Sequence, residues 1–358
     1  MAYSYRGQLI LLQYRLLKMG KVLVTRQLII CLGIILVTIL FIRQTPSPRP
    51  VVIQQLPCEA LFENPDDFPY HFTTRKTRVT PLDFNLLTSG HDICEADSID
   101  IVILVVTEHN HVPLRQMIRS TWGAKKTVRR GSKRWNIQTV FLFGLHQDKN
   151  MNHDVKLEAA IYGDIVIFDF KDSYYNLTYK VLLGLKWVQD ACRQAKYVLK
   201  TDDDTYLNLP EILQRLESEE WNTKICGCFS QSEPVERNDI KSKVSMKSYP
   251  IKNYPPHVKG RAYFMPRHIA TKLVSVAEYI PYVNIEDVHV TGILAKSVGN
   301  IEHRGLTEEE YHPYHPAKNC EILSGNILVS STTAETGLAI WKELQDGNTH
   351  KNCDQTNY

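Results

Sequence analysis

Short apolar runs, rich in β-branched and aromatic residues, recur along the chain. They lie at residues 99–106, 140–143, 165–168 and 197–199. Runs of this length and composition predict buried strands. Segments with helical patterning alternate with them, at residues 114–123, 177–192 and, beginning at Pro210, 210–220. Strands that alternate with helices predict an α/β fold with a doubly wound, mainly parallel sheet.

The N-terminal region carries a different pattern. Residues 28–42 (LIICLGIILVTILFI) contain no charged residue, which predicts a single membrane-spanning helix. A run of this length is short for a ~30 Å bilayer core, and residues 22–24 can extend it. A signal peptide is the alternative, but no convincing small-residue cleavage site follows. Basic residues gather before the run, at Arg6, Arg15, Lys18, Lys21 and Arg26. They predict a cytosolic tail over 1–27, a signal-anchor over 28–42 and a type II topology.

The region after the anchor is predicted to lie in an oxidising lumen. Residues 45–50 (TPSPRP) and Pro57 indicate an extended stem over 43–97, with order expected to begin between 80 and 98. A folded domain is then expected over 98–358. The chain has 8 cysteines, all but Cys31 beyond the anchor, which suits a lumenal protein. Asn176 heads an Asn-Leu-Thr sequon and is the predicted glycosylation site.

Composition and motifs exclude several function classes. The net charge of +3 is too balanced to indicate a nucleic-acid partner. The chain has neither a GxxxxGK[ST] loop nor a GxGxxG turn, so neither a P-loop NTPase nor a dinucleotide-dependent oxidoreductase is indicated. It also lacks the GxSxG nucleophile elbow.

Three consecutive aspartates, Asp202 to Asp204, directly follow the apolar run 197–199. Adjacent carboxylates raise one another's pKa unless positive charge lies between them. Ligands of parallel sheets bind beyond the carboxyl ends of strands, where this triplet is expected. Oxygen ligands select Mg²⁺ or Mn²⁺, which commonly join carboxylates to substrate phosphates. The triplet therefore predicts a metal site for a diphosphate, such as that of a nucleotide sugar. A polar turn or helix cap is the alternative.

A second acidic pair, Glu286 and Asp287, precedes the periodic apolar segment 288–298. The pair suits the first turn of an ordinary core helix, where acidic residues favour the helix dipole. It also suits a general base, which needs a carboxylate on a rigid element. The sequence of this segment alone does not distinguish a structural role in the helix from a role as general base.

Six stretches, in order and with similar spacing, carry a resemblance to a known family. They are RQMIRSTWG (115–123), VFLFG (140–144), DFKDSYYNLTYK (169–180), YVLKTDDDTYLN (197–208), YPPHVKG (254–260) and EDVHVTG (286–292). Through them, residues 98–358 resemble the β-1,3-galactosyltransferase and β-1,3-N-acetylglucosaminyltransferase family of Golgi type II enzymes, glycosyltransferase family 31. The resemblance implies a GT-A-type, Rossmann-like fold with helices on both faces of the sheet.

The resemblance also implies an activity: inverting transfer of galactose or an N-acetylhexosamine from a UDP-sugar to a glycan in β1,3 linkage. The acceptor would be a glycoprotein or glycolipid, the metal Mn²⁺ with Mg²⁺ possible, and the location the Golgi membrane. Asp204 is the implied direct metal ligand, and Asp202 lies nearer the nucleotide or donor sugar. Residues implied at the nucleotide are Arg115, Arg119, Lys180, Asp202 and Asp203. Asp287 is the implied base, with Glu286 beside it.

One departure from the family pattern bears on the metal. Members usually carry a C-terminal histidine that binds it, and Ser330 stands at the aligned position. His303, His312 and His315 are the candidate substitutes, although each also suits an ordinary loop. A lumenal glycan-binding relative that has lost turnover is therefore the alternative function.

Overall fold

The computed structural model describes residues 64–346, except 68, 90, 95–97, 125, 131–132, 300, 308 and 313–314. The predicted cytosolic tail and the predicted span 28–42 lie outside the described residues. Within the described part of the chain, no helix is long and apolar enough to cross a membrane. The chain divides into two compact units after Cys58, and the described residues all belong to the second unit.

Four parallel strands form the centre of a nine-stranded sheet, in the order β5-β4-β2-β6. They are β5 (Ile165–Lys171), β4 (Lys133–Leu145), β2 (Ile101–Val106) and β6 (Tyr197–Asp202). Strand β2 pairs in parallel with both β4 and β6. Each of the four contains one of the apolar runs, so the predicted strands and their parallel arrangement are confirmed here.

The outer part of the sheet is not mainly parallel, which corrects the prediction. Strand β9 (His257–Pro266) runs antiparallel to both β6 and β8 (Ile225–Ser230). Strands β1 (Leu86–Thr88) and β3 (Lys126–Arg130) are antiparallel to β5 and β4, and β10 (His303–Gly305) is parallel to β8. Strands β8 and β9 are joined by a loop without a crossover helix, and only such a helix would have returned the chain in the parallel direction. A smaller sheet contains β11 (Tyr311–His312), β12 (Val329–Ser331) and β7 (Thr205–Leu207).

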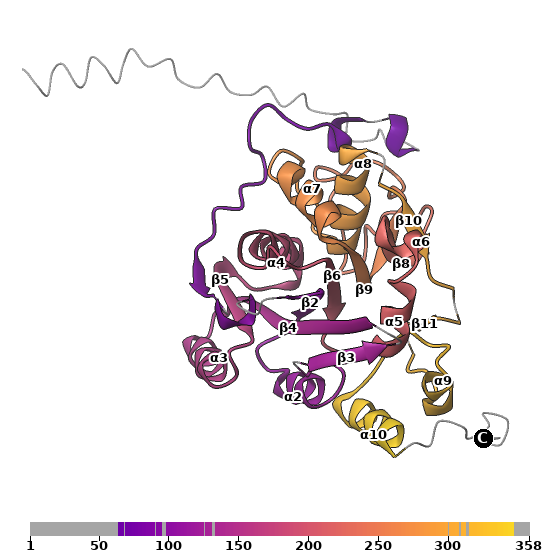
Figure 1. The fold of residues 1–358 in the computed structure, drawn as a ribbon. Helices are drawn as coiled ribbons and strands as arrows, with labels where there is room; N and C mark the ends of the chain where they lie inside the picture. Colours follow the sequence, from indigo (N-terminus) through magenta and orange to yellow (C-terminus); the bar gives the residue numbers. More distant parts are fainter. Residues whose placement is uncertain are drawn as a thin grey trace, which may run out of the picture. The chain divides into compact units, whose positions relative to one another are not determined.

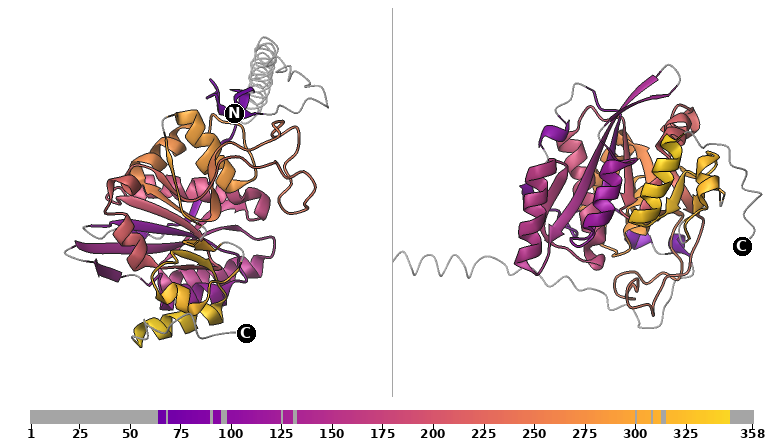
Figure 2. Two further views of the ribbon diagram at one scale, coloured as in Figure 1. Left: turned by 90° about the vertical axis from the view of Figure 1, so that its right-hand side faces the viewer. Right: turned by 90° about the horizontal axis from the view of Figure 1, so that it is seen from below.

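Helices cover both faces of the large sheet, as predicted (Figures 1 and 2). Along β2, Val102 and Leu104 belong to one apolar cluster, whereas Ile101, Ile103 and Val105 belong to the other. This alternation is expected for a strand buried on both sides. Helices α4 (Leu177–Ala191) and α7 (Arg267–Ala277) contribute to the first cluster. Helices that contribute to the second are α2 (Val112–Ser120), α3 (Lys149–Tyr162), α5 (Leu209–Arg215) and α10 (Ala334–Gln345).

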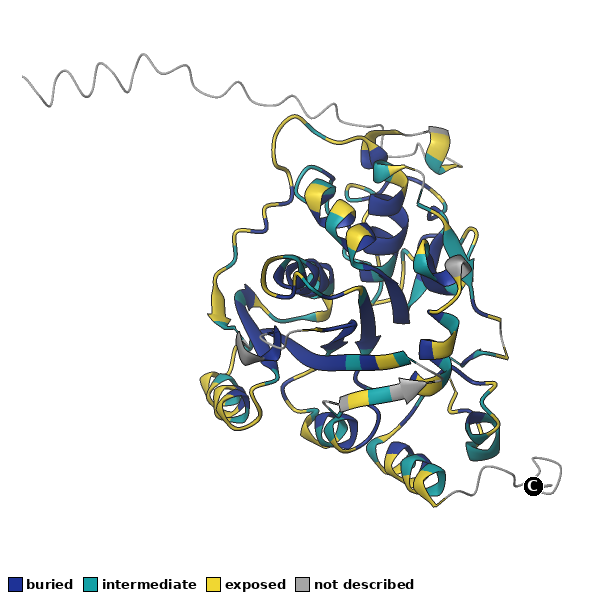
Figure 3. Cartoon of the chain, viewed as in Figure 1, coloured by how far each residue is buried: buried dark blue, intermediate teal, exposed yellow. Residues whose placement is uncertain are grey.

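The remaining helices are short. They are α6 (Glu219–Asn222), α8 (Ala295–Val298), α9 (Asn319–Leu323), a π-helical segment (Val288–Leu294), and the 3₁₀ turns Pro65–Asp67, Pro69–Phe72, His91–Cys94 and Tyr174–Asn176. The helix predicted over 210–220 is therefore divided: α5 ends at Arg215 and α6 begins at Glu219. Figure 3 shows that the central strands are buried and that exposed residues lie on the outer helix surfaces.

Part of the predicted stem packs onto the domain. Phe72, Leu82 and Ile93 are buried in the first apolar cluster. A disulfide joins Cys94 to Cys192, just after α4. The folded unit thus begins well before residue 98. The apolar side chains of residues 72–93 cover part of the hydrophobic core, which would be exposed to solvent without them. Residues 43–63, 68, 90 and 95–97 of the predicted stem lie outside the described residues.

Candidate active site

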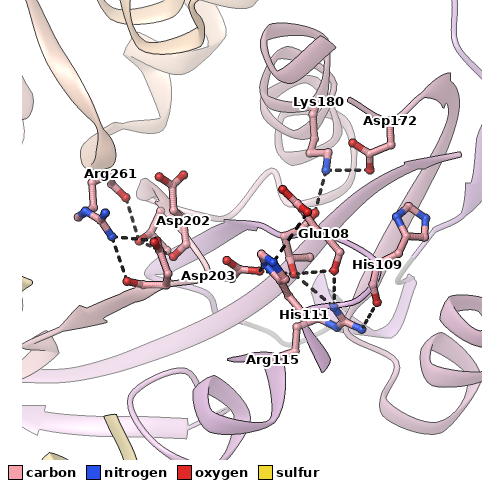
Figure 4. A network of polar contacts seen from close by, with 12 residues as sticks. Glu108, His109, His111, Arg115, Asp172, Lys180, Asp202, Asp203 and Arg261 are labelled. Atoms are coloured by element: carbon pink, nitrogen blue, oxygen red, sulfur yellow. Dashed lines mark hydrogen bonds and ion pairs between the residues drawn. The ribbon is translucent and has the colours of Figure 1, made fainter. Parts of the chain in front are cut away.

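A pocket of about 660 Å³ opens where the four parallel strands end. Its lining includes residues 106–111 after β2, His146 after β4, residues 172–174 after β5 and residues 202–204 at the end of β6. The carboxyl ends of parallel strands meet at one edge, which explains why segments so far apart in sequence converge. The acidic triplet lies at the carboxyl end of β6, where the sequence predicted it, and Figure 4 shows two of its members, Asp202 and Asp203.

The three aspartates have different surroundings. Asp203 is buried, and its carboxylate lies 2.6 Å from Thr107 Oγ1 and 2.9 Å from His111 Nδ1. The hydrogen bond to Asp203 raises the pKa of His111. Asp203 was predicted to contact the nucleotide, but its carboxylate instead ties the end of β6 to the loop after β2. The middle residue of the triplet therefore shapes the pocket wall.

Asp202 and Asp204 are the more accessible members of the triplet. Their side chains are 34% and 48% exposed. Both have cationic neighbours: Lys200 Nζ lies 2.7 Å from Asp202, and Arg261, 2.8 Å from Asp204, is close enough to act on Asp202 as well. Within the described residues, no group of three or more His, Cys, Asp or Glu side chains could hold a metal by itself. Two accessible carboxylates fit a hard divalent cation whose coordination is completed by substrate phosphates.

Ser330 does not face the pocket as a metal ligand. It is fully buried in β12, where its hydroxyl accepts a hydrogen bond from the Ala317 N–H at 2.8 Å. Strand β12 pairs with β7, which places Ser330 opposite Tyr206, two residues after the triplet. His303, one of the candidate substitutes, lies against the Thr291 carbonyl at 2.7 Å.

Glu286 is buried in a polar network behind the triplet. The Tyr263 hydroxyl donates a hydrogen bond to it, and Lys200 Nζ lies 3.2 Å away. Burial raises the pKa of Glu286 to about 7. Lys200 is itself 1% exposed and contacts both Asp202 and Glu286, so it joins the acidic triplet to the acidic pair.

Asp287 is more accessible than Glu286. Its carboxylate accepts a hydrogen bond from the Val288 N–H at 2.9 Å, and no ion pair holds it among the residues described. Burial raises the pKa of pocket-lining Tyr174, and the negative charges of Asp287 and Asp202 raise it further, so the Tyr174 hydroxyl lies near both carboxylates. This geometry favours Asp287 over Glu286 as a base.

Lys180, predicted to bind the nucleotide, lines the pocket, and its contact with a nucleotide stays a prediction. It is buried on α4, 2.8 Å from the Asp172 carboxylate and 2.9 Å from the Thr107 carbonyl oxygen. Its ammonium therefore bridges the ends of β5 and β2 (Figure 4).

Arg115 and Arg119 lie behind the pocket wall and do not line it. Arg115 is fully buried, where it pairs with Glu158 and donates to the carbonyls of Glu108 and His109. Arg119 pairs with Glu158 and Asp164. Both were predicted to contact the nucleotide. In the structure Arg115 instead holds the loop after β2 against α2 and α3, and Arg119 joins α2 to α3 and to the residue before β5.

The sequence reasoning missed three histidines at the pocket: His109, His111 and His146. Burial lowers the pKa of His109 to about 4, so its ring is neutral, and its centroid lies 5.1 Å from that of His146. The sequence contained one signal for two of these histidines: residues 107–111 directly follow the strongest apolar run. A loop at the carboxyl end of a central strand is the expected place for ligand-contacting residues.

The sequon lies beside the pocket, at the start of α4. Asn176 donates a hydrogen bond to the Lys171 carbonyl at 2.8 Å, and Thr178 is buried against the Val283 carbonyl. Leu177, between them, lines the pocket. Glycosylation of Asn176 stays a prediction, and a glycan there would stand close to the pocket.

Comparison with known proteins identifies the family. Residues 114–306 match the family model described as Galactosyltransferase. The chain is 34% identical over 236 residues to beta-1,3-galactosyltransferase 1 of Homo sapiens, which covers 64% of this chain and 70% of that protein. It is 34% identical over 210 residues to beta-1,3-galactosyltransferase 5 of Gorilla gorilla gorilla, covering 58% of this chain and 69% of that protein.

A solved structure of the galactosyltransferase LgtC is 10% identical in sequence to this chain. The aligned region covers 71% of this chain and 98% of the LgtC chain. The TM-score of 0.33 is too low for this likeness to support a conclusion. The family assignment depends on the family model, which matches more than half of the chain, and on the identity to the two relatives. This chain belongs to the β-1,3-galactosyltransferase family and is a glycosyltransferase.

Proposed function

We propose that the protein is an inverting hexosyltransferase with a GT-A-type fold, which transfers galactose or an N-acetylhexosamine from a UDP-sugar to a glycan in β1,3 linkage. The observation that carries this proposal is the pocket at the strand ends, with Asp202 and Asp204 on its edge and Asp287 close by. The names of the relatives support the β1,3 linkage and favour galactose as the donor sugar.

The chemistry of this chain centres on Asp287. Its carboxylate would take the proton of the acceptor hydroxyl as that oxygen attacks the anomeric carbon, while the bond from that carbon to the diphosphate breaks. Attack from the face opposite the leaving group inverts the configuration, through an oxocarbenium-like transition state like that of glycoside hydrolysis. Lys200 and Tyr263 hold the side chain of Glu286 next to the base, and Lys200 also donates to the carbonyl of Gly260, which lies beside Asp287; together these contacts would orient the base.

Asp204 and Asp202 would hold the metal, Mn²⁺ or Mg²⁺, together with phosphate oxygens of the donor. Such a cation supplies positive charge near the diphosphate. Lys180 and Asp202 line the pocket and are the residues we assign to the donor nucleotide. Asp203 is part of the pocket wall, and Arg115 and Arg119 support that wall from behind.

A binding-only relative is the second candidate function. Two observations favour it: Ser330 replaces the imidazole of the family pattern, and both accessible aspartates already have cationic neighbours. In this case the pocket would bind a nucleotide sugar or a glycan without turnover.

A transfer assay separates the two. The protein is incubated with Mn²⁺ and UDP-galactose, UDP-N-acetylglucosamine or UDP-N-acetylgalactosamine, with and without β-linked acceptor oligosaccharides. UDP release that depends on the acceptor, with a β1,3-linked product, supports the enzyme. Donor binding without UDP release under any of these conditions favours the binding-only relative.

We also propose that residues 28–42 anchor the protein in the Golgi membrane with the catalytic domain in the lumen. The uncharged run and its basic N-terminal flank support this topology. Protease digestion of intact Golgi vesicles tests it: the catalytic domain should be protected until detergent is added. Digestion of that domain in intact vesicles would contradict the topology.

A further inference from the structure

Lys241 lines the pocket but lies outside the six stretches that carry the family resemblance. Its loop spans residues 231–256, between β8 and β9, and Lys241 is exposed while lining the pocket. Its Nζ lies 4.8 Å from the centre of the Tyr174 ring, within the range of a cation–π contact. The Tyr175 hydroxyl donates to the Ile240 carbonyl at 2.6 Å, which fixes the loop beside the pocket.

Among the described residues, Lys241 Nζ forms no ion pair with a carboxylate; the nearby Asp239 carboxylate accepts a hydrogen bond from the Lys241 backbone N–H at 3.0 Å and interacts with the ammonium only through its charge. The other cationic groups of the pocket lining have such partners: Lys180 pairs with Asp172, and His111 with Asp203. His109 has a pKa lowered by burial and carries no charge at neutral pH. Lys241 therefore presents the ammonium that is available to an anionic ligand.

We infer that Lys241 binds the diphosphate of the donor and offsets the negative charge that develops on the leaving phosphate. This inference rests on the proposed function. When the bond between the anomeric carbon and the phosphate oxygen breaks, its electron pair stays on that oxygen, while the acceptor proton passes to Asp287. A charged donor at 2.7–2.9 Å from a phosphate oxygen makes one of the stronger protein hydrogen bonds.

The position of Lys241 complements the change at Ser330. A chain without the aligned imidazole has one ligand fewer to hold a divalent cation against the diphosphate. An ammonium at the pocket mouth supplies positive charge from a different segment of the lining than the one that carries Asp204. The Tyr174 ring keeps the long side chain at the mouth before the donor enters, which reduces the entropy lost on binding.

The test compares Lys241→Met and Lys241→Arg with a matched control, Lys247→Met. Lys247 is an exposed lysine of the same loop that does not line the pocket. Calorimetry in EDTA measures the Kd of UDP and of uridine for each protein. Lys241→Met should weaken UDP binding by roughly 10-fold or more and leave uridine binding unchanged, because only UDP carries the diphosphate. Lys241→Arg and Lys247→Met should bind UDP within about 2-fold of the wild type.

Three results would overturn the inference, and they have different consequences. If Lys241→Met binds UDP as the wild type does, the lysine does not contact the diphosphate, although the proposed function stands. If UDP and uridine binding weaken together, Lys241 acts by holding the loop and not by its charge. If the wild type binds UDP neither in EDTA nor with Mn²⁺, the proposed function fails and the inference fails with it.

Discussion

Glu286 and Asp287 are adjacent in sequence, yet their side chains have different environments. Glu286 is 3% exposed between Lys200 and Tyr263, whereas Asp287 is partly exposed and contacts the N–H of Val288. A buried, paired carboxylate is suited to holding structure, while an accessible one can receive a proton. Glu286 is therefore the positioning residue of the acidic pair, and Asp287 is the proposed base.

Replacing Asp287 by Asn should abolish transfer while UDP binding stays near that of the wild type. A general base contributes typically ~10²–10⁴-fold to rate, and the amide keeps the shape of the side chain. Single-turnover transfer and UDP calorimetry on the same preparation measure both effects. If Glu286→Gln is the damaging change and Asp287→Asn is mild, the base has been assigned to the wrong carboxylate.

The raised pKa of Glu286 predicts a pH dependence of stability. Burial raises it from 4.5 to about 7, so the folded protein holds this proton more tightly than the unfolded chain does. The stabilisation is fully present below about pH 4.5 and is lost as the pH rises through about 7. The contribution of Glu286 to the unfolding free energy should fall across this window by about 3 kcal/mol at most, and urea denaturation isolates it as the difference between the wild type and Glu286→Gln.

Glu286→Gln is the matched variant for this effect, because it keeps the volume of the side chain and removes its titration. The contribution of Glu286 to the pH dependence should disappear. Parallel stability curves for the two proteins would show that Glu286 has an ordinary pKa.

Metal and nucleotide should bind cooperatively. Asp202 and Asp204 supply few ligands by themselves, so phosphate oxygens are expected to complete the coordination. We expect each ligand to strengthen binding of the other by about 1–3 kcal/mol, equally in both directions. Calorimetry of Mn²⁺ with and without UDP measures the coupling. Tight binding of Mn²⁺ by the free protein would instead indicate a further ligand, and His312 and His315 would be the first to replace.

At the scale of elements, strand β9 positions the base. A Cβ at Gly260 would lie 3.2 Å from Asp287 Oδ2 and 3.3 Å from its Cγ. The glycine of the YPPHVKG stretch therefore allows the strand to approach Asp287 closely, and a side chain there would push the carboxylate away.

Gly260→Ala should lower the turnover rate by roughly 10-fold, because a small misplacement of a catalytic group is costly, and should leave UDP affinity unchanged. Steady-state kinetics with calorimetry tests it. Gly163→Ala, at a glycine with no atom within 4 Å of its added Cβ, is the control for a general loss of stability, since its positive φ makes the change strained but remote. Equal effects of both changes on turnover would contradict the positioning role.

At the scale of the whole folded unit, the segment before residue 98 completes the core. Phe72, Leu82 and Ile93 are buried, and Cys94 is bonded to Cys192. Each buried apolar side chain contributes about 1.5–3 kcal/mol, and a disulfide typically about 2–4 kcal/mol. The catalytic domain therefore includes much of the segment 64–97, which its composition had suggested to be part of an extended stem.

A protein that begins at residue 98 should be less stable than one that begins at residue 64, by roughly 5 kcal/mol or more. Urea denaturation of the two truncated chains under oxidising conditions measures the difference. Coincident transitions would mean that the segment contributes nothing to the core.

The sequence by itself determined the parallel centre of the sheet and the place of the acidic triplet. Both depend on local patterns: apolar runs are long enough to specify strands, and charged residues after a run must leave the sheet at its edge. The helix over residues 177–192 followed in the same way from its spacing, and the structure has it at Leu177–Ala191.

The tertiary structure alone decided the roles of single side chains and the limits of the domain. Arg115 and Asp203 are polar residues in matching motifs, but their partners, Glu158 and His111, are distant in sequence, and only folding brings them together. The antiparallel β9 and the buried Phe72 likewise depend on contacts between remote segments. Local patterning cannot predict such contacts, because the free energy that selects them comes from packing across the whole unit.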